Sequence, residues 1–247
     1  MSRSARTSPS AKRTQKRASA PADATVGDEQ PREPREPRGA RRRRETREKL
    51  IEAAFSLMAE RGLDAVTINE ITEAADVGIG SFYNHFESRE ALQAAVIDTV
   101  FEEFADHLDR LVVAIDDPAE VIAISVRHTV LRAQHEPLWG QFLVKEGLST
   151  RALTRGLGAR LARDIQRGIA KRRFSTPDPT MSLITLGAGV LGAIAAVLET
   201  QKPDSMLQSL GLDRGSAAER AAAMLLHGLG LSFDQADVIA RLPLPEI

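Results

Sequence analysis

The spacing of apolar residues most limits the folds open to this chain. From about residue 43 to residue 241, apolar side chains recur at three- and four-residue steps, and no run alternates with period two. The 247 residues are 43% hydrophobic, which is enough to form the core of one large domain or two modest ones. The pattern therefore predicts an all-α fold in which each helix buries one apolar face.

Signals at helix ends divide this pattern into segments. Thr67 and Glu70 have the spacing of a capping box, Gly62 is suited to end the helix before it, and Ser88 is suited to cap a later one. Prolines mark further helix starts. The predicted helices are 43–61, 67–75, 79–85, a long helix from 88, and then 118–134, 137–146, 150–172, 178–201, 214–231 and 234–241.

The first 40 residues differ from the rest of the chain. They contain no Leu, Ile, Phe or Trp, so we predict a disordered basic arm over 1–40. Residues 1–44 carry 13 Lys/Arg and 5 Asp/Glu, whereas the remainder carries 20 and 29. Such an arm suits a polyanionic partner or serves only as a solubilising tail, and composition leaves both open.

The absence of cysteine excludes disulfides, cysteine zinc sites and thiol catalysis. No apolar run follows the basic N-terminus, so a secretory signal is not expected. Both observations fit a cytoplasmic protein.

A short helix after a tight turn provides the first functional indication. The predicted helices 67–75 and 79–85 flank a turn at 76–78, which is the helix-turn-helix plan whose second helix enters the DNA major groove. Phe82 and Phe86 are four residues apart and are expected to face the core. The other side then carries Ile79, Gly80, Ser81, Tyr83, Asn84 and His85. An aromatic cluster at this spacing is also typical of plain core packing.

The stretch "VTINEITEAADVGIGSFYNHFESREAL" (66–92) resembles the signature of the TetR family. The matching positions are Thr67, Ile71, Val77, Gly80, Tyr83, His85, Phe86, Arg89, Glu90 and Leu92. The resemblance covers the N-terminal head directly and the rest of the chain only in helix count and size. It implies a homodimeric, ligand-responsive transcriptional regulator, usually a repressor, that binds a palindromic double-stranded DNA operator.

The resemblance also implies roles for residues. Tyr83 and His85 would contact phosphate and groove, and Thr67 and Arg89 would contact phosphate. Residues 41–92 hold 8 Lys/Arg and 10 Asp/Glu, so attraction to DNA must rely on the arginines that open the first helix. The predicted DNA-binding set is Arg43, Arg44, Thr67, Asn69, Gly78, Ile79, Gly80, Ser81, Tyr83, Asn84, His85 and Arg89.

Two departures from the family pattern affect the turn. Asp76 stands where glycine is common, and Gly78 stands where a Ser or Thr cap is common, so the recognition helix is expected to lack a side-chain cap. We expect a helix-turn-helix head over 41–88 and a larger helical body for effector binding and dimerisation over 89–247.

One segment of the body admits a different reading. Residues 180–198 are uncharged and long enough to span a membrane, so the alternative function is a membrane-associated helical protein anchored there. The TetR resemblance instead places dimerising helices at about 178–201 and 214–231 and implies no membrane. In the second helix, Ala217, Ala221, Met224, Leu225 and Leu229 are expected to share one face.

Aromatic and imidazole side chains in the body are candidates for an effector pocket, with core packing as the alternative. They are Phe104, His107, His128, Trp139 and Phe142. No carboxylate completes a metal site with these histidines, and no catalytic or phosphate-loop motif is present. The sequence therefore predicts a non-enzymatic protein without a metal or a cofactor.

Overall fold

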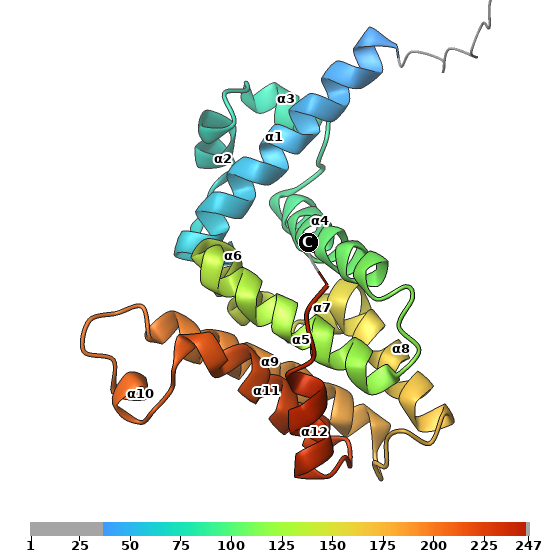
Figure 1. The fold of residues 1–247 in the computed structure, drawn as a ribbon. Coiled ribbons are helices and arrows are strands. Elements are labelled where there is room, and N and C mark those ends of the chain that lie inside the picture. Colours follow the sequence, from blue (N-terminus) through green and yellow to red (C-terminus); the bar gives the residue numbers. More distant parts are fainter. Residues whose placement is uncertain (1–36, 246–247) are drawn as a thin grey trace, which may run out of the picture. The chain divides into compact units, whose positions relative to one another are not determined.

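A computed structural model describes residues 37–245 (Figure 1). All regular structure in this range is helical, which confirms the predicted fold class. The predicted arm falls mostly on residues 1–36, which lie outside the described residues. Its last residues are not arm, because the first helix already begins at Arg38. Ion pairs one turn apart, Arg41 with Glu45 and Arg44 with Glu48, support this early start.

The head consists of α1 (Arg38–Arg61), a 3-10 turn η1 (Leu63–Ala65), α2 (Ile68–Ala74) and α3 (Ile79–Tyr83). α1 packs against α2, and α2 packs against α3 (Figure 1). Leu50, Ile71 and Phe82 are fully buried between them. The head therefore has a core that fixes α3 against α1 and α2.

Local capping explains where these helices begin. Thr67 accepts a hydrogen bond from the Glu70 amide and Glu70 accepts one from the Thr67 amide, so the predicted capping box is confirmed. Ser88 caps α4 through the Ala91 amide. Asp76 has φ 52°, in the left-handed region that Asp tolerates, and this conformation forms the turn before α3. No side-chain hydrogen bond caps α3 at Gly78, as predicted.

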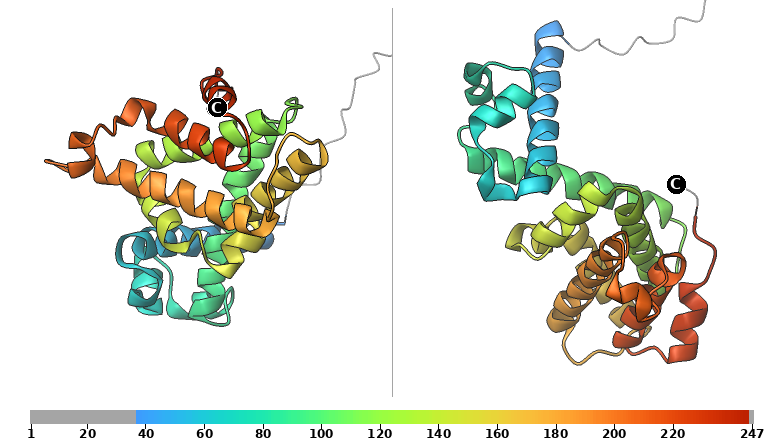
Figure 2. Two further views of the ribbon diagram at one scale, coloured as in Figure 1. Left: turned by 90° about the horizontal axis from the view of Figure 1, so that it is seen from below. Right: turned by 90° about the vertical axis from the view of Figure 1, so that its left-hand side faces the viewer.

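α4 (Arg89–Leu111) continues from the head into the body. The body contains α5 (Pro118–His135), α6 (Pro137–Glu146), α7 (Thr150–Thr154), α8 (Gly156–Ala170), α9 (Pro179–Glu199), α10 (Met206–Ser209), α11 (Arg214–Gly228) and α12 (Phe233–Ala240). α5 packs against α6, α8, α9, α11 and α12, and α9 lies beside α11 (Figure 2). Most of α5 is consequently buried, as expected for a helix that is apolar on most sides.

Two local features differ from the predicted helices. The predicted helix 150–172 is two helices, because Gly156 has φ +51° and lies against Phe101. A Cβ at this position would lie 2.9 Å from the Cβ of Phe101, so the chain turns here without a side chain. α10 was not predicted, because four residues are too few to show helical periodicity.

α9 is, by length and composition, apolar enough to cross a membrane. Nevertheless it packs against α5, α6, α8 and α11, and Leu186, Leu191 and Ile194 lie buried on the side that faces them. Only 22% of its most apolar 18-residue stretch is buried within the chain, so the side of α9 that faces away from these helices is uncovered.

Candidate nucleic-acid interface and body cavity

The short helix α3 separates its apolar and polar side chains as the spacing predicted. Phe82 and Phe86 are buried in the core, whereas Tyr83 is 57% exposed and Ile79 is 50% exposed. The Tyr83 ring meets the Phe82 ring edge-on, with centroids 5.2 Å apart. The only tyrosine of the chain thus packs against Phe82 on one side and is exposed to solvent on the other.

The start of α3 is bare. A Cβ at either Gly78 or Gly80 would meet no atom within 4 Å, so the fold itself leaves room for side chains at both positions. Their absence allows another molecule to approach the backbone closely, which is how a recognition helix meets a duplex.

Arginines of α1 lie beside the end of α3. The Arg43 guanidinium donates to the Asn84 carbonyl at 3.2 Å, and Arg47 stacks on the Phe86 ring at 5.2 Å. Burial lowers the pKa of His85, and the charges of Arg43 and Arg47 lower it further, so the imidazole is neutral at neutral pH. Arg47 was absent from the predicted set, although its position one turn after Arg43 was a usable signal.

Three predicted residues are engaged within the head. The Arg89 guanidinium donates to the carbonyls of Asp64 and Val66 at 3.0 and 3.3 Å and thereby ties α4 to η1. The Thr67 hydroxyl donates to Glu70 at 2.7 Å. Arg44 lies 3.8 Å from Glu48. Their phosphate contacts stay predictions, since each requires these groups to share or exchange partners.

Glu70 also shows how the helix cap is stabilised. Hydrogen bonds from the Thr67 amide and hydroxyl, and then one from Arg61, lower the pKa of Glu70 to about 2. Of the remaining predicted residues, Asn69 and Asn84 are exposed and Ser81 is half-buried. Most of the predicted DNA-binding residues, Arg43 among them, therefore lie on the α3 side of the head.

The body contains a partly open cavity of about 100 Å³. Its walls come from α4, α5, α6, α7, α8 and α9 and are mostly apolar, with Phe101, Ile122, Leu143 and Leu157 among them. Its polar lining consists of Ser125, Thr129, Asp109, Arg160 and Asp164. Apolar walls with a few polar groups are typical of a small-molecule site.

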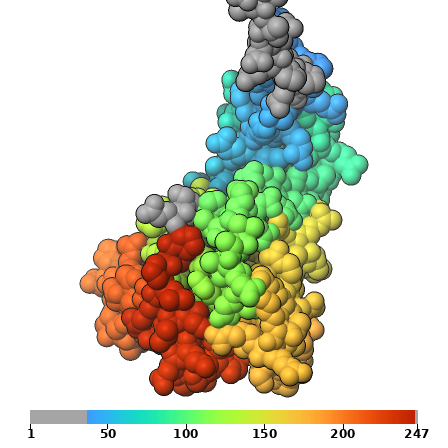
Figure 3. All heavy atoms as spheres, turned by 45° about the vertical axis from the view of Figure 1, so that its right-hand side comes forward, coloured from blue at the N-terminus to red at the C-terminus, as the bar shows by residue number. Residues whose placement is uncertain are grey.

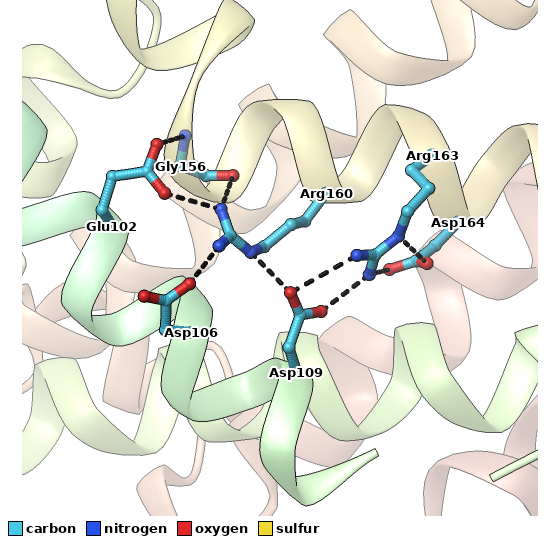
Figure 4. A network of polar contacts seen from close by, with 7 residues as sticks. All are labelled: Glu102, Asp106, Asp109, Gly156, Arg160, Arg163 and Asp164. Atoms are coloured by element: carbon cyan, nitrogen blue, oxygen red, sulfur yellow. Dashed lines mark hydrogen bonds and ion pairs between the residues drawn. The ribbon is translucent and has the colours of Figure 1, made fainter. Parts of the chain in front are cut away.

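A network of charges holds the polar side of the cavity (Figure 4). Arg160 of α8 binds three carboxylates of α4: Glu102 at 2.8 Å, Asp109 at 2.8 Å, and Asp106. Arg163 binds Asp109 at 2.8 Å. Burial alone would raise the pKa of Asp109, but hydrogen bonds from Arg163 and Arg160 lower it below its usual value. Asp109 is therefore charged at neutral pH, and its ion pairs bind α4 to α8.

The five predicted pocket residues lie elsewhere. Phe104, His107, His128 and Trp139 gather between α4, α5 and α6, outside the lining of this cavity. Phe142 packs between Phe55 and Phe101, with ring centroids at 5.3 and 5.9 Å, and only Phe101 reaches the cavity. The sequence did carry a signal for the charge network beside this cavity, because cations at 160 and 163 match acids at 102, 106 and 109 with helical spacing. Effector binding by the five predicted residues stays a prediction.

Known protein families and solved structures resemble this chain. Residues 50–96 match the family described as "Bacterial regulatory proteins, tetR family", and residues 117–242 match "Tetracyclin repressor-like, C-terminal domain". The chain belongs to the TetR family. It is a DNA-binding transcriptional regulator that responds to a ligand, and not an enzyme.

Individual relatives agree with this assignment. The structure of RolR in complex with resorcinol is 38% identical, with a TM-score of 0.63, and the match covers 84% of this chain and 99% of that one. The repressor DhaR of Mycobacterium sp. (strain GP1) is 35% identical over 38% of this chain and 46% of that one. KstR2 of Rhodococcus jostii is 40% identical over 24% and 28%. Matches to these curated repressors therefore span less than half of their length.

Proposed function

We propose that this TetR-family protein is a cytoplasmic repressor. A homodimer binds a palindromic operator through the α3 faces of its two heads and leaves the operator when a small phenolic molecule enters the body cavity. Operator half-sites would lie about 34–36 Å apart, one turn of the duplex.

The cavity carries the effector part of the proposal. Its volume of about 100 Å³ is on the scale of the cavity of about 150 Å³ that holds benzene in a protein core. Its charged groups, Asp109, Arg160 and Asp164, provide acceptors and donors for ring hydroxyls. The solved structure of RolR, which is similar to this chain, contains resorcinol, a small phenol. The FadR structure with stearoyl-CoA is 15% identical and shows the fold alone.

The uncovered sides of α9 and α11 support the dimer. Met181, Ile184, Ala188, Gly192 and Ala195 are exposed along α9 at three- and four-residue steps. Met224 of α11 is exposed beside them, whereas Ala217 and Leu229, which were expected on this face, are buried inside the chain's own body. A continuous apolar stripe of this kind fits a symmetric interface with a second copy. Ala188→Glu is expected to yield a monomer in sedimentation velocity, and a dimer that persists would contradict this interface.

The effector proposal is tested by operator release. Fluorescence anisotropy of a labelled operator selected from random duplexes is followed during titration with resorcinol, phenol and stearoyl-CoA. Release by the phenols and not by the acyl-CoA is expected. Release by stearoyl-CoA alone would contradict the size argument.

Gly187 offers a graded control for the same measurement. It lines the cavity, and a Cβ added there meets no atom within 4 Å. Gly187→Leu should fill the cavity and abolish release while operator binding persists, and Gly187→Ala should respond nearly as the native protein does. Equal responses from both variants would show that effectors bind elsewhere.

A further inference from the structure

One histidine of α4 and one of α5 lie near enough to interact electrostatically. His128 of α5 is 3% exposed, and His107 of α4 lies close enough to affect its charge. Among the described residues, neither ring nitrogen of His128 makes a hydrogen bond of normal geometry, although the Pro245 backbone acts on it, and Nε2 of His107 has no hydrogen-bond partner. A buried imidazole without partners is tolerated far better in its neutral form than in its charged form.

The surroundings of the pair are aromatic and cationic. The His107 ring stacks on Phe104, which meets Trp139 edge-on at 5.0 Å. The Arg132 guanidinium lies over Phe104 and Trp139 at 4.8 and 4.6 Å. Protonation of the histidine pair would thus add a positive charge near the Arg132 guanidinium.

Carboxylates near this region already have arginine partners. Arg127, next to His128 on α5, lies 3.5 Å from Glu219 of α11, and Glu219 also lies 3.7 Å from Arg241 after α12. On α5 itself, Arg132 binds Glu136 at 3.1 Å. On α4, Asp106 is bound by Arg160. The groups that act on the charge of His128 are thus His107, Arg127 and the Pro245 backbone.

Residues that follow α12 lie beside this pair. Residues 242–245, here called the C-terminal strap, follow α12 and run beside α5 toward α4 (Figures 1 and 3). The Leu242 carbonyl accepts a hydrogen bond from Arg127. Leu244 packs on Val112 at the end of α4 and on Val121 and Ile124 of α5. The Pro245 backbone faces His128. The strap thus joins α4 to α5 and covers His128.

We propose that His107 and His128 form an acid-sensitive latch, in which charging of His128 releases the C-terminal strap and loosens α4 from α5. Burial lowers the pKa of His128 below 6.5, and His107 and Arg127 lower it further, while the Pro245 backbone opposes them. The open state therefore binds a proton more readily than the closed state. Closure is favoured at neutral pH and weakens as pH falls from about 6.5 toward the lower folded-state pKa.

The consequence for regulation rests on the proposed function. α4 begins at Arg89, directly after the recognition helix, so loosening its far end is expected to reduce operator affinity in mild acid. The latch itself is a property of the free protein and is tested without DNA or effector.

Trp139 is the only tryptophan of the chain and packs in this cluster, so its fluorescence reports on the latch directly. Fluorescence and hydrogen exchange of the Leu242 and Leu244 amides are followed from pH 7.5 to 5.0, with exchange times corrected for intrinsic rates. Pro243 and Pro245 have no amide hydrogen. Far-UV circular dichroism is followed in parallel. Strap opening should increase by up to about tenfold per pH unit, as one bound proton requires, while helicity is retained.

Histidine variants identify the group. His128→Gln should abolish the pH-dependent change. His107→Gln should move its midpoint to lower pH, because without the electrostatic effect of His107 the folded-state pKa of His128 lies closer to the open-state value and acid favours opening less. His135→Gln is the matched control, because His135 lies on the same helix and is exposed, and it should behave as the native protein does. An unchanged transition in both His128→Gln and His107→Gln, or no transition in the native protein above pH 5, would overturn the latch. Should His128→Gln fail to fold, the midpoint of His107→Gln still decides the question.

Discussion

The head and the body treat their polar residues in opposite ways. On α3, Tyr83 and the bare backbone at Gly78 and Gly80 meet solvent, with few bonds to the rest of the chain. At the cavity, Arg160, Arg163 and Asp109 are bonded to one another across two helices. The proposed DNA-binding face is thus presented by its backbone, whereas the polar side of the proposed effector cavity is held in position by neighbouring charges. The two regions should therefore respond differently to substitution.

The largest expected effect is in the body. Arg160→Ala leaves Glu102, Asp106 and Asp109 without their shared cation. The carboxylates are 35–57% exposed, so each of the three ion pairs contributes up to about 1 kcal/mol and the total loss is up to about 3 kcal/mol. Urea unfolding should show this loss. Arg155→Ala is the control on the neighbouring turn: its side chain is 59% exposed and pairs only with Asp98, so the loss should stay below about 1 kcal/mol. Equal losses would mean that the network adds nothing beyond surface pairing.

On the head, Tyr83→Ala should leave the fold intact and weaken operator binding roughly 10- to 100-fold, since a hydrogen bond to a charged group contributes about 1.5–3 kcal/mol. Anisotropy titration gives the affinity and a thermal melt gives the stability. Val113→Ala, an 84% exposed position outside the head, serves as the comparison and should change neither. A lower melting temperature for Tyr83→Ala with unchanged affinity would reverse the assigned role.

Gly80→Ala separates folding from recognition at one position. The new methyl group meets no atom of the chain, and alanine favours a helix over glycine by about 0.5–1 kcal/mol. The variant should therefore melt slightly higher and yet bind the operator more weakly, because the methyl group lies where the duplex approaches. Unchanged affinity in the titration would place the duplex away from the start of α3.

The smallest effect concerns the missing cap. Gly78→Ser supplies the side-chain acceptor that α3 lacks and should stabilise the head by a few tenths of a kcal/mol. Slower hydrogen exchange of the α3 amides is the sensitive measurement. Gly78→Ala, which supplies no acceptor, should not slow exchange, and equal slowing in both variants would assign the effect to the lost flexibility of glycine.

The same contrast explains what the sequence revealed. The capping box at Thr67, the turn at Asp76 and the opposite faces of Phe82 and Tyr83 depend on neighbours within a few residues, and each was predicted correctly. The cavity depends on contacts between residues about 50 apart, such as Glu102 with Arg160. Periodicity shows which face of a helix is apolar but not which helix it meets, so it could not tell that the predicted pocket residues and the lining of this cavity lie in different clusters.

The glycine at position 156 bears on how effector specificity changes among regulators of this kind. Because Phe101 leaves no room for a side chain there, a larger residue would force α8 to begin one position later or earlier. Each residue of displacement turns a helix by about 100°, which would swing Arg160 away from its acids and present other side chains to the cavity. After gene duplication, one substitution at Gly156 would thus change which effector the body binds, while the operator sequence bound by the head stays the same.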